Sequence, residues 1–369
     1  MGAYIAKRLL LMIPTLFGIM LMTFGIIQFV PGGPIERILA QIQGTAVDAT
    51  ARIGGQSGGE VGRAGDTGIG DNSAAVRYRG AQGLDPEFIK KLEVQFGFDK
   101  PAHERFFLMM KNYLTFNFGE SYFRNKPVVD LMIEKMPVSI SLGLWLALIT
   151  NFVSIPLGIR KAVKDGSHFD TWTSAVIIVG YAIPGFILAV FLIVMFAGGS
   201  YLNWFPLRGL TSDDFSSYSA FGKIVDYAWH LVLPLIALGI GGFATTTLLT
   251  KNSFLDEIKK QYVVTARAKG LAEQRVLYGH VFRNAMLIVI AGFPGAFLGA
   301  FFTGSLLIEQ IFSLDGLGLL TFNAAVNRDY PVFFANVYIF TLVGLLVALL
   351  SDLTYTFVDP RIDFESRDL

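Results

Sequence analysis

The stretch VTARAKGLAEQRVLYGHVFRNA, residues 264–285, carries clustered charges, yet it lies between two apolar runs that are long enough to cross a membrane. Gly270 divides this stretch and can adopt the positive φ that ends a helix. Apolar residues at helical spacing on both sides are typical of amphipathic helices. The pattern predicts two short helices that meet at Gly270 and protrude from a membrane domain, one through Phe254, Ile258 and Tyr262 and one from Leu277 to Ala285. The spacing alone also fits a basic linker that only marks the cytoplasmic side.

The composition indicates an integral membrane protein. Hydrophobic residues make up 53% of the 369 residues, whereas charged residues make up only 16%, and a soluble protein of this length would carry more charge. The formal net charge of +1 provides no global field that would attract nucleic acid. The absence of cysteine excludes disulfides and thiolate metal sites.

Six apolar runs are long enough to cross a bilayer, and they predict an all-α, polytopic fold with six transmembrane helices. The first run follows Lys7 and Arg8 and lacks the features of a cleavable signal peptide. We therefore expect it to remain as a membrane helix. The runs lie at or near residues 1–30, 137–159, 171–197, 229–250, 285–308 and 332–357.

Lysine and arginine are distributed unevenly between the loops, and this sets the expected orientation because these cations resist translocation. Loop 160–170 contains three of them and loop 251–284 contains seven, whereas loops 198–228 and 309–331 contain two and one. We therefore expect a multi-pass membrane protein with both termini in the cytoplasm.

The sequence divides into three parts. Residues 1–30 form the N-terminal membrane helix, residues 31–136 form a periplasmic loop, and residues 137–369 form a core with five membrane helices and the cytoplasmic loop 251–284. Within the outer loop, the insertion at residues 44–83 contains 11 glycines and almost no large apolar residue, so it cannot bury a core. It fits either a draped surface segment or a contact surface for an external partner.

The rest of the outer loop predicts short amphipathic helices. Their apolar positions are Phe88, Leu92 and Phe96 in one helix and Phe106, Met109, Met110 and Tyr113 in the next. A last helix, residues 127–137, leads directly into the second membrane span and is typical of an interfacial segment.

Ionisable residues are nearly absent from the predicted spans. Asp352 is the only carboxylate there, and it lies near the cytoplasmic end of the sixth run. Carriers driven by protons or sodium ions usually hold acids or histidines near the membrane midplane, so the pattern weighs against a secondary carrier. The four histidines lie in separate segments, and the chain has no phosphate-binding loop, zinc motif or nucleophile elbow. We predict no metal site and no enzymatic activity, and we expect another polypeptide to supply energy.

Small residues recur every four positions in the fifth run and predict close packing of that helix. The packing partner is either another helix of this chain or a second subunit, and the spacing leaves both open. The residues are Ala291, Gly295, Gly299 and Thr303.

The run YVVTARAKGLAEQRVLYGHVFRNAM resembles the EAA-type cytoplasmic loop of ABC importer permeases, in the form of the dipeptide and oligopeptide family. Its core matches the motif at Ala266, Arg267, Ala268 and Gly270, and Val264 stands where the motif has a glutamate. Other phrases of the family follow in order along nearly the whole chain, among them FGFDKP, HLVLPLIALG, IEQIFSLDGLGLL and DPRIDF. The chain is identified as a member of this family.

The resemblance implies a type I ABC importer permease of the bacterial inner (cytoplasmic) membrane. It would form half of a translocation pathway for peptides, and in one branch for peptide-like antibiotics such as microcin C. The resemblance also implies a second homologous permease, cytoplasmic ATPase subunits that bind ATP and Mg, and a periplasmic substrate-binding protein, with no cofactor on this chain. By this resemblance the ATPase-coupling positions are Val264, Thr265, Ala266, Arg267, Ala268, Lys269 and Gly270. Substrate-binding residues are not identified.

Two alternatives belong to other classes. A secondary active peptide carrier would transport independently of ATP, and a membrane scaffold would transport nothing. The shortage of charged residues in the spans disfavours the first.

Overall fold

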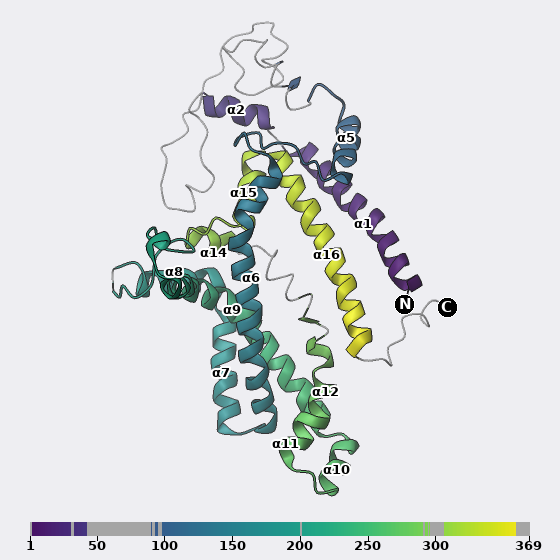
Figure 1. Ribbon diagram of the computed structural model, residues 1–369, viewed down its shortest axis with the longest axis vertical. Coiled ribbons are helices and arrows are strands. Elements are labelled where there is room, and N and C mark those ends of the chain that lie inside the picture. Colours follow the sequence, from purple (N-terminus) through teal and green to yellow (C-terminus); the bar gives the residue numbers. More distant parts are fainter. Residues whose placement is uncertain are drawn as a thin grey trace. The chain divides into compact units, whose positions relative to one another are not determined.

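A computed structural model of the protein (Figure 1) describes residues 2–30, 33–42, 90, 93–94, 98–199, 201–290, 292–293, 295 and 306–358. The described residues are helical apart from loops and one isolated antiparallel bridge, between Glu120 and Pro127, which confirms the all-α class for this part of the chain. Four described helices are long and apolar enough to cross a membrane: α1 (Gly2–Phe29), α6 (Val128–Val163), α9 (Ala220–Ile258) and α16 (Tyr330–Val358).

The predicted number of six spans stays a prediction. A bent pair of helices provides a fifth candidate, and half of the run 285–308 lies outside the described residues. Three members of the small-residue stripe, Ala291, Gly299 and Thr303, also lie outside them. Gly295 is described, and a Cβ atom there would meet no atom within 4 Å. The packing role of this stripe is therefore still a prediction.

The chain forms two compact units, which are described separately. Unit 1 comprises Met1–Met12, Lys135–Leu319 and Leu342–Leu369. Unit 2 comprises Ile13–Glu134 and Leu320–Thr341. The three-part division predicted at residues 30/31 and 136/137 stays a prediction, and the insertion at 44–83 lies outside the described residues.

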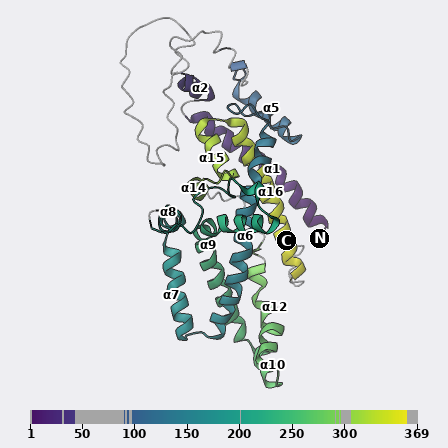
Figure 2. The same cartoon turned by 60° about the vertical axis from the view of Figure 1, so that its left-hand side comes forward.

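Unit 1 is built on α6, α7 (His168–Ala182) and α9, which run side by side in Figure 1 and Figure 2. A Cβ atom at Gly158 of α6 would lie 2.7 Å from the carbonyl oxygen of Thr247 and 2.7 Å from Cβ of Thr250, both on α9. Only glycine allows this approach of the two helices. The contact sets the spacing of α6 and α9 one turn before α6 ends.

The run 171–197, predicted as one span, forms two helices, and its crossing of the membrane as one broken span stays a prediction. α7 ends at Ala182, and α8 (Gly185–Phe196) leaves it at an angle of 96°. Pro184 has no backbone N–H and disfavours a helical residue before it, and Ile183 is extended. α8 packs against α9, where a Cβ atom at Gly185 would lie 2.7 Å from the carbonyl oxygen of Ala237.

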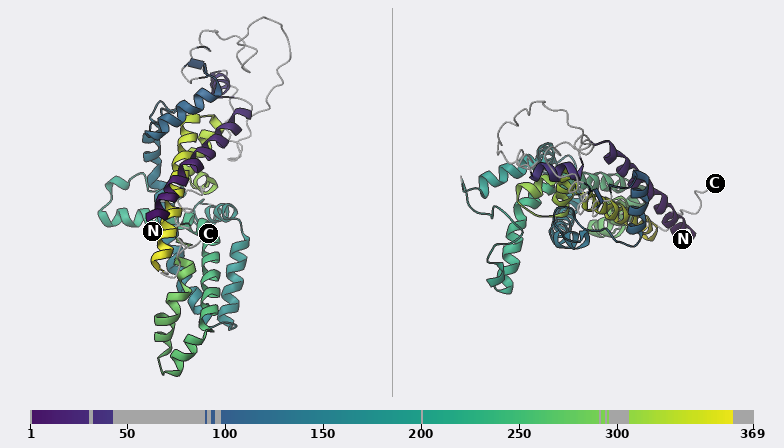
Figure 3. Two further views of the ribbon diagram at one scale, coloured as in Figure 1. Left: turned by 90° about the vertical axis from the view of Figure 1, so that its right-hand side faces the viewer. Right: turned by 90° about the horizontal axis from the view of Figure 1, so that it is seen from above.

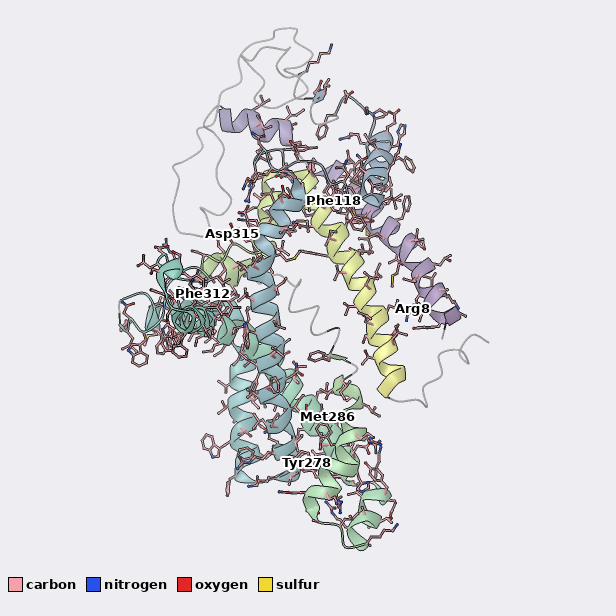
Figure 4. The ribbon with its side chains drawn as sticks, in the orientation of Figure 1. Arg8, Phe118, Tyr278, Met286, Phe312 and Asp315 are labelled. Carbon is pink, nitrogen blue, oxygen red and sulfur yellow. The ribbon has the colours of Figure 1, made fainter. Side chains whose placement is uncertain are left out.

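The segment after α14 (Leu306–Ile311) folds around a buried carboxylate. Glu309 is 2% exposed and accepts a hydrogen bond of 2.7 Å from the backbone N–H of Leu319, in the first turn of α15 (Leu317–Asn327). A negative group is favourable at a helix N-terminus. Lys135 of α6 forms an ion pair of 2.5 Å with Asp315, which Figure 4 labels, so the turn between α14 and α15 is joined to α6.

The start of α1 and the end of α16 meet in unit 1 through a polar cluster. Arg8 Nη2 lies 2.7 Å from Asp352 Oδ2, and the Tyr4 hydroxyl donates a hydrogen bond of 2.8 Å to the same oxygen. Figure 4 labels Arg8 at this end of α1. The carboxylate that the sequence places near the end of the sixth run is therefore paired with a cation of the first.

Unit 2 contains α2 (Pro34–Ile42), α5 (Ala102–Leu114) and parts of α1, α6, α15 and α16. The predicted amphipathic helix at Phe106 and Tyr113 is confirmed, because both side chains are buried in α5. The ring centroid of Phe106 lies 5.3 Å from that of Phe24 in α1. The segment 127–137 is not a separate helix, because Val128 begins α6 and the helix continues through Pro137. The helix predicted at Phe88, Leu92 and Phe96 lies at residues outside the described ones.

Replacing Gly158 with alanine is expected to destabilise the protein. The new methyl group would overlap the backbone of α9, and overpacking of this kind costs about 1–3 kcal/mol. The measurement is the free energy of unfolding, or the melting temperature, in a mild detergent.

Gly241→Ala in α9 is the matched control, because a Cβ atom there would meet nothing within 4 Å. Alanine in a helix interior is favoured over glycine by about 0.5–1 kcal/mol. If the two variants melted alike, the close approach at Gly158 would not set the stability of this contact.

Candidate functional site

The cytoplasmic loop predicted at 251–284 begins on the long helix α9 and turns sharply. α9 ends at Ile258, and α10 (Gln261–Ala268) begins after an extended residue, Lys260. The prediction of one helix through Phe254, Ile258 and Tyr262 is therefore wrong. After this turn the side chain of Val263 is 0% exposed, and this apolar burial stabilises the bend.

Glu257 fastens this turn. Its carboxylate accepts a hydrogen bond of 2.7 Å from the hydroxyl of Tyr262 and pairs with Lys260. The last turn of α9 is thereby joined to the first turn of α10. The direction of α10 is set both by polar contacts and by its buried face.

The inner face of α10 packs into a continuous apolar cluster. Val263 and Ala266 are the buried residues of α10. The other buried members come from α6, α9 and the segment after Gly270, so three parts of unit 1 hold the loop in place: Ile159, Ala162, Phe254, Val276, Val281, Ala285, Met286 and Val289. Figure 4 labels Met286 at the base of the loop.

Gly270 ends α10 as the sequence predicts. Its φ is +79°, in the left-handed region that favours glycine. The N–H of Gly270 donates to the carbonyl of Arg267 at 2.9 Å, and the N–H of Leu271 donates to that of Ala266 at 3.4 Å. These two bonds form a Schellman motif, which satisfies the last carbonyl groups of the helix and reverses the chain.

A bidentate ion pair braces this reversal. Arg267 donates to both carboxylate oxygens of Glu273, at 2.5 Å from Nη2 and 3.0 Å from Nε. The hydrogen bonds from Arg267 lower the pKa of Glu273 below its usual value. Glu273 begins α11 (Glu273–Val276), so the pair connects the end of α10 to the start of the next helix.

The second predicted helix of the loop is helical but not regular. α11 is followed by a π-helical turn at Leu277–Val281 and by α12 (Phe282–Ala285). The Ser253 hydroxyl of α9 donates a hydrogen bond to the carbonyl oxygen of Ala285. This bond attaches the end of the segment to α9. Tyr278, which Figure 4 labels, is 60% exposed on the outside of the loop.

The structure places six of the seven predicted coupling residues at the surface and one inside. Val264, Thr265, Arg267, Ala268, Lys269 and Gly270 are exposed, whereas Ala266 is 7% exposed and belongs to the core. In Figure 1 and Figure 3 the loop extends beyond the turn that connects α6 and α7. The exposed residues form one surface at the end of α10, and we call this surface, residues 264, 265 and 267–270, the loop tip.

An ion network near the loop was not foreseen from the sequence. Lys161 of α6 is fully buried, and its ammonium group lies 2.9 Å from Asp170 Oδ1. It also donates to the hydroxyls of Thr173 and Ser174 at 2.7 and 2.8 Å. A buried ammonium group requires such compensation.

Lys251 extends this network to α9. Its ammonium group lies 2.7 Å from Asp170 Oδ2 and 2.9 Å from Asp165 Oδ1. Asp170 of α7 therefore joins α6, α7 and α9, and α9 is the helix that leads into the loop. The sequence showed Lys161 and Lys251 only as cations that set orientation, because nothing local distinguishes a buried lysine from an exposed one.

Comparison with known proteins identifies the class of this chain. A family model described as "Binding-protein-dependent transport system inner membrane component" matches residues 154–364, which is more than half of the chain. The protein belongs to this family. The match includes the end of α6, the bent pair, all of α9, the loop and α16.

Comparison with individual proteins shows similarity over nearly the full length of the chain. The chain is 64% identical to the "Peptidoglycan transport system permease protein YejB" of Agrobacterium fabrum and 58% identical to the "Inner membrane ABC transporter permease protein YejB" of Escherichia coli O157:H7, with 100% of both chains covered in each comparison. It is 31% identical to the "Oligopeptide transport system permease protein AppB" of Bacillus subtilis, covering 99% of this chain and 100% of that one.

The resemblance found in the sequence is confirmed, and the full-length identities extend it to YejB permeases. The protein is an ABC permease subunit with a type I importer fold, a multi-pass inner-membrane protein and a transport component rather than an enzyme.

Replacing Asp170 with asparagine is expected to destabilise unit 1 strongly. The change leaves the buried Lys161 without its counter-charge, and breaking a buried pair costs about 3–5 kcal/mol. Thermal unfolding of the purified protein in detergent measures the effect.

Asp165→Asn provides the control, because Asp165 pairs with the same Lys251 but is 49% exposed. An exposed pair contributes less than about 1 kcal/mol. Equal losses from the two variants would show that burial of the network is not what stabilises this end of unit 1.

Proposed function

We propose that the protein carries peptides across the inner membrane as one permease subunit of an ATP-binding-cassette importer, and that the loop tip receives the motion of a cytoplasmic ATPase. The structure of the loop is the observation that supports the proposed contact with the ATPase. The inner face of the loop is anchored in the core of unit 1, and its outer face ends in six exposed residues around a fixed reversal.

The peptide assignment is supported by the names of the relatives. The Bacillus subtilis relative is named for oligopeptide transport and the Agrobacterium relative for peptidoglycan transport. Peptides, including those that peptidoglycan contains, are the chemical class common to both names. Peptide-like antibiotics such as microcin C fall in the same class and are included in the proposal.

The proposed assembly contains four kinds of chain. A second homologous permease completes the pathway, and a periplasmic substrate-binding protein delivers the peptide. One fused or two separate ATPase subunits bind ATP and Mg, so this chain needs no cofactor of its own. The stripe of Ala291, Gly295, Gly299 and Thr303 is a candidate contact for the second permease, and the insertion 44–83 is a candidate contact for the external protein.

The proposed orientation places both termini and the loop in the cytoplasm. The contact of Arg8 with Asp352 supports ends on one side of the membrane, because it joins the start of α1 to the end of α16. The concentration of lysine and arginine in loops 160–170 and 251–284 supports the cytoplasmic side. The division into residues 1–30, 31–136 and 137–369 belongs to the same proposal.

The proposed mechanism is a two-state equilibrium biased at the loop tip. ATPase closure moves α10, and the packed cluster and α9 carry this displacement into the membrane helices. α9 is one helix of 39 residues from Ala220 to Ile258, so a force on its end acts along its length. The Asp170 network joins that helix to α6 and α7.

Reversing the charge of Arg267 is expected to weaken ATPase association. Arg267→Glu places two acids together where the bidentate pair stood and changes the charge of the loop tip. The exposed pair contributes little to folding, so the protein should remain in the membrane. The measurements are copurification of the ATPase in mild detergent and ATP-dependent peptide uptake, both expected to fall by at least about tenfold, which corresponds to about 1.4 kcal/mol.

Two further variants separate docking from folding. Lys223→Glu changes the same charge at the other end of α9 and should leave association intact. The double exchange Arg267→Glu with Glu273→Arg restores the internal pair but not the cation at position 267. Normal association and uptake by Arg267→Glu would refute the assigned role of the loop tip.

The substrate assignment is tested in vesicles that contain this chain with its permease partner, ATPase and binding protein. Uptake of a labelled dipeptide should require ATP and should continue when an ionophore removes ion gradients. Abolition by the ionophore would favour the secondary carrier. Vesicles that admit no peptide with every partner present would favour the scaffold.

A further inference from the structure

Unit 2 contains a cavity that no part of the proposed mechanism uses. Its volume is about 340 Å³, at the lower end of the range of small-molecule sites. Its lining comes from the end of α1, from residues 98 and 100 before α5, from α5 itself, from the loop at 117–122 and from the start of α16. All of these residues belong to unit 2, and we call the space the unit 2 cavity.

Aromatic side chains form much of its wall. The ring of Tyr113 lies 4.8 Å from that of Phe118, which Figure 4 labels, and Tyr330 lies 6.1 Å from Phe334. Tyr122 completes this part of the lining. Rings of this kind provide apolar area together with hydroxyl donors at the wall. Such a surface favours a ligand with a bulky apolar group.

The charged groups that line the cavity are both cations. They are Lys100 and Arg105, and no described lining residue is acidic. The guanidinium carbon of Arg105 lies 4.5 Å from the ring centroid of Phe98, and its Nη2 donates to Gln28 at 3.0 Å. The planar group is therefore held in one orientation at the wall. A fixed guanidinium is the side chain best suited to a carboxylate.

Neutral polar groups accompany these cations. Asn112 and Asn117 line the cavity and can pair with amide groups of a ligand. Burial raises the pKa of Tyr122, so its phenol stays a neutral donor. Asp329 accepts from the N–H of Tyr122 at 3.0 Å and from the hydroxyl of Ser121, which fixes this loop although Asp329 does not line the cavity.

We propose that the unit 2 cavity binds the free carboxyl terminus of a peptide whose last side chain is bulky and apolar. Arg105 and Lys100 bind the carboxylate, the asparagine amides bind the adjacent peptide group, and the aromatic wall holds the side chain. A cavity of this volume accepts the end of a peptide rather than a long chain. This proposal rests on the proposed function, in which the substrates are peptides. It adds that the cavity recognises the free carboxylate at the end of the peptide.

Equilibrium binding to the full chain, in nanodiscs of zwitterionic phosphatidylcholine and without the external binding protein, tests the proposal. The probes are Ala-Phe and its C-terminal amide, measured by calorimetry. The free acid should bind at least about tenfold more tightly, because a hydrogen bond to a charged group contributes more than one between neutral groups. Arg105→Gln should remove most of this difference.

Lys111→Gln is the matched control, since it removes a cation from the exposed side of the same helix and lies outside the cavity. Lys100→Gln is the second test variant, because Lys100 is exposed and its loss should not affect folding. It should weaken binding of the acid at least about threefold and leave the melting temperature unchanged.

Equal affinity for acid and amide would overturn the proposal, as would unchanged binding of the acid in both Arg105→Gln and Lys100→Gln. Loss of acid binding when phosphatidylglycerol replaces the neutral lipid would assign the cavity to a lipid anion instead. If the acid binds more tightly than the amide but the complex transports no peptide, the proposed ligand of the cavity is supported and the proposed function is refuted. If the complex transports peptide but the acid and the amide bind equally well, the proposed function is supported and the proposed ligand of the cavity is refuted.

Discussion

The buried carboxylate of Asp170 is the constraint on which unit 1 depends. It faces two ammonium groups, from Lys161 and Lys251, and Lys161 has no exposed surface. A charge in such a place is costly unless its partner is held in position. α6, α7 and α9 must therefore keep one arrangement at this end. Because α9 continues to Ile258 without interruption, the fixed arrangement extends to the base of the cytoplasmic loop.

The loop depends on that base for its shape. α10 has only eight residues and would not be stable as an isolated helix. Its order comes from Val263 and Ala266, which pack against the α6 and α9 side chains that the network positions. The Schellman turn at Gly270 and the pair between Arg267 and Glu273 then hold the exposed end. In the proposed mechanism, this packing would transmit a displacement of the loop tip to the membrane helices.

Local sequence signals predict some of these features and not others. The long apolar runs identify four membrane-length helices, and Gly270 ends a helix because its positive φ is a property of one residue. The bend at Pro184 has a local cause, yet the apolar run through it is as long as a single span. The turn at Lys259 and the network at Asp170 depend on residues distant in the chain, so helical spacing alone cannot predict them.

The position of Val264 bears on how the loop tip can bind. The related motif has a glutamate there, whereas this chain presents an apolar side chain that is 51% exposed. The carboxylate of Glu273, after the loop tip, is already paired with Arg267. An approaching surface would therefore meet an apolar residue beside an arginine whose exposed pair contributes less than about 1 kcal/mol. Exchanging that partner costs little, so in the proposed docking role contact at Val264 would provide affinity and Arg267 would provide specificity.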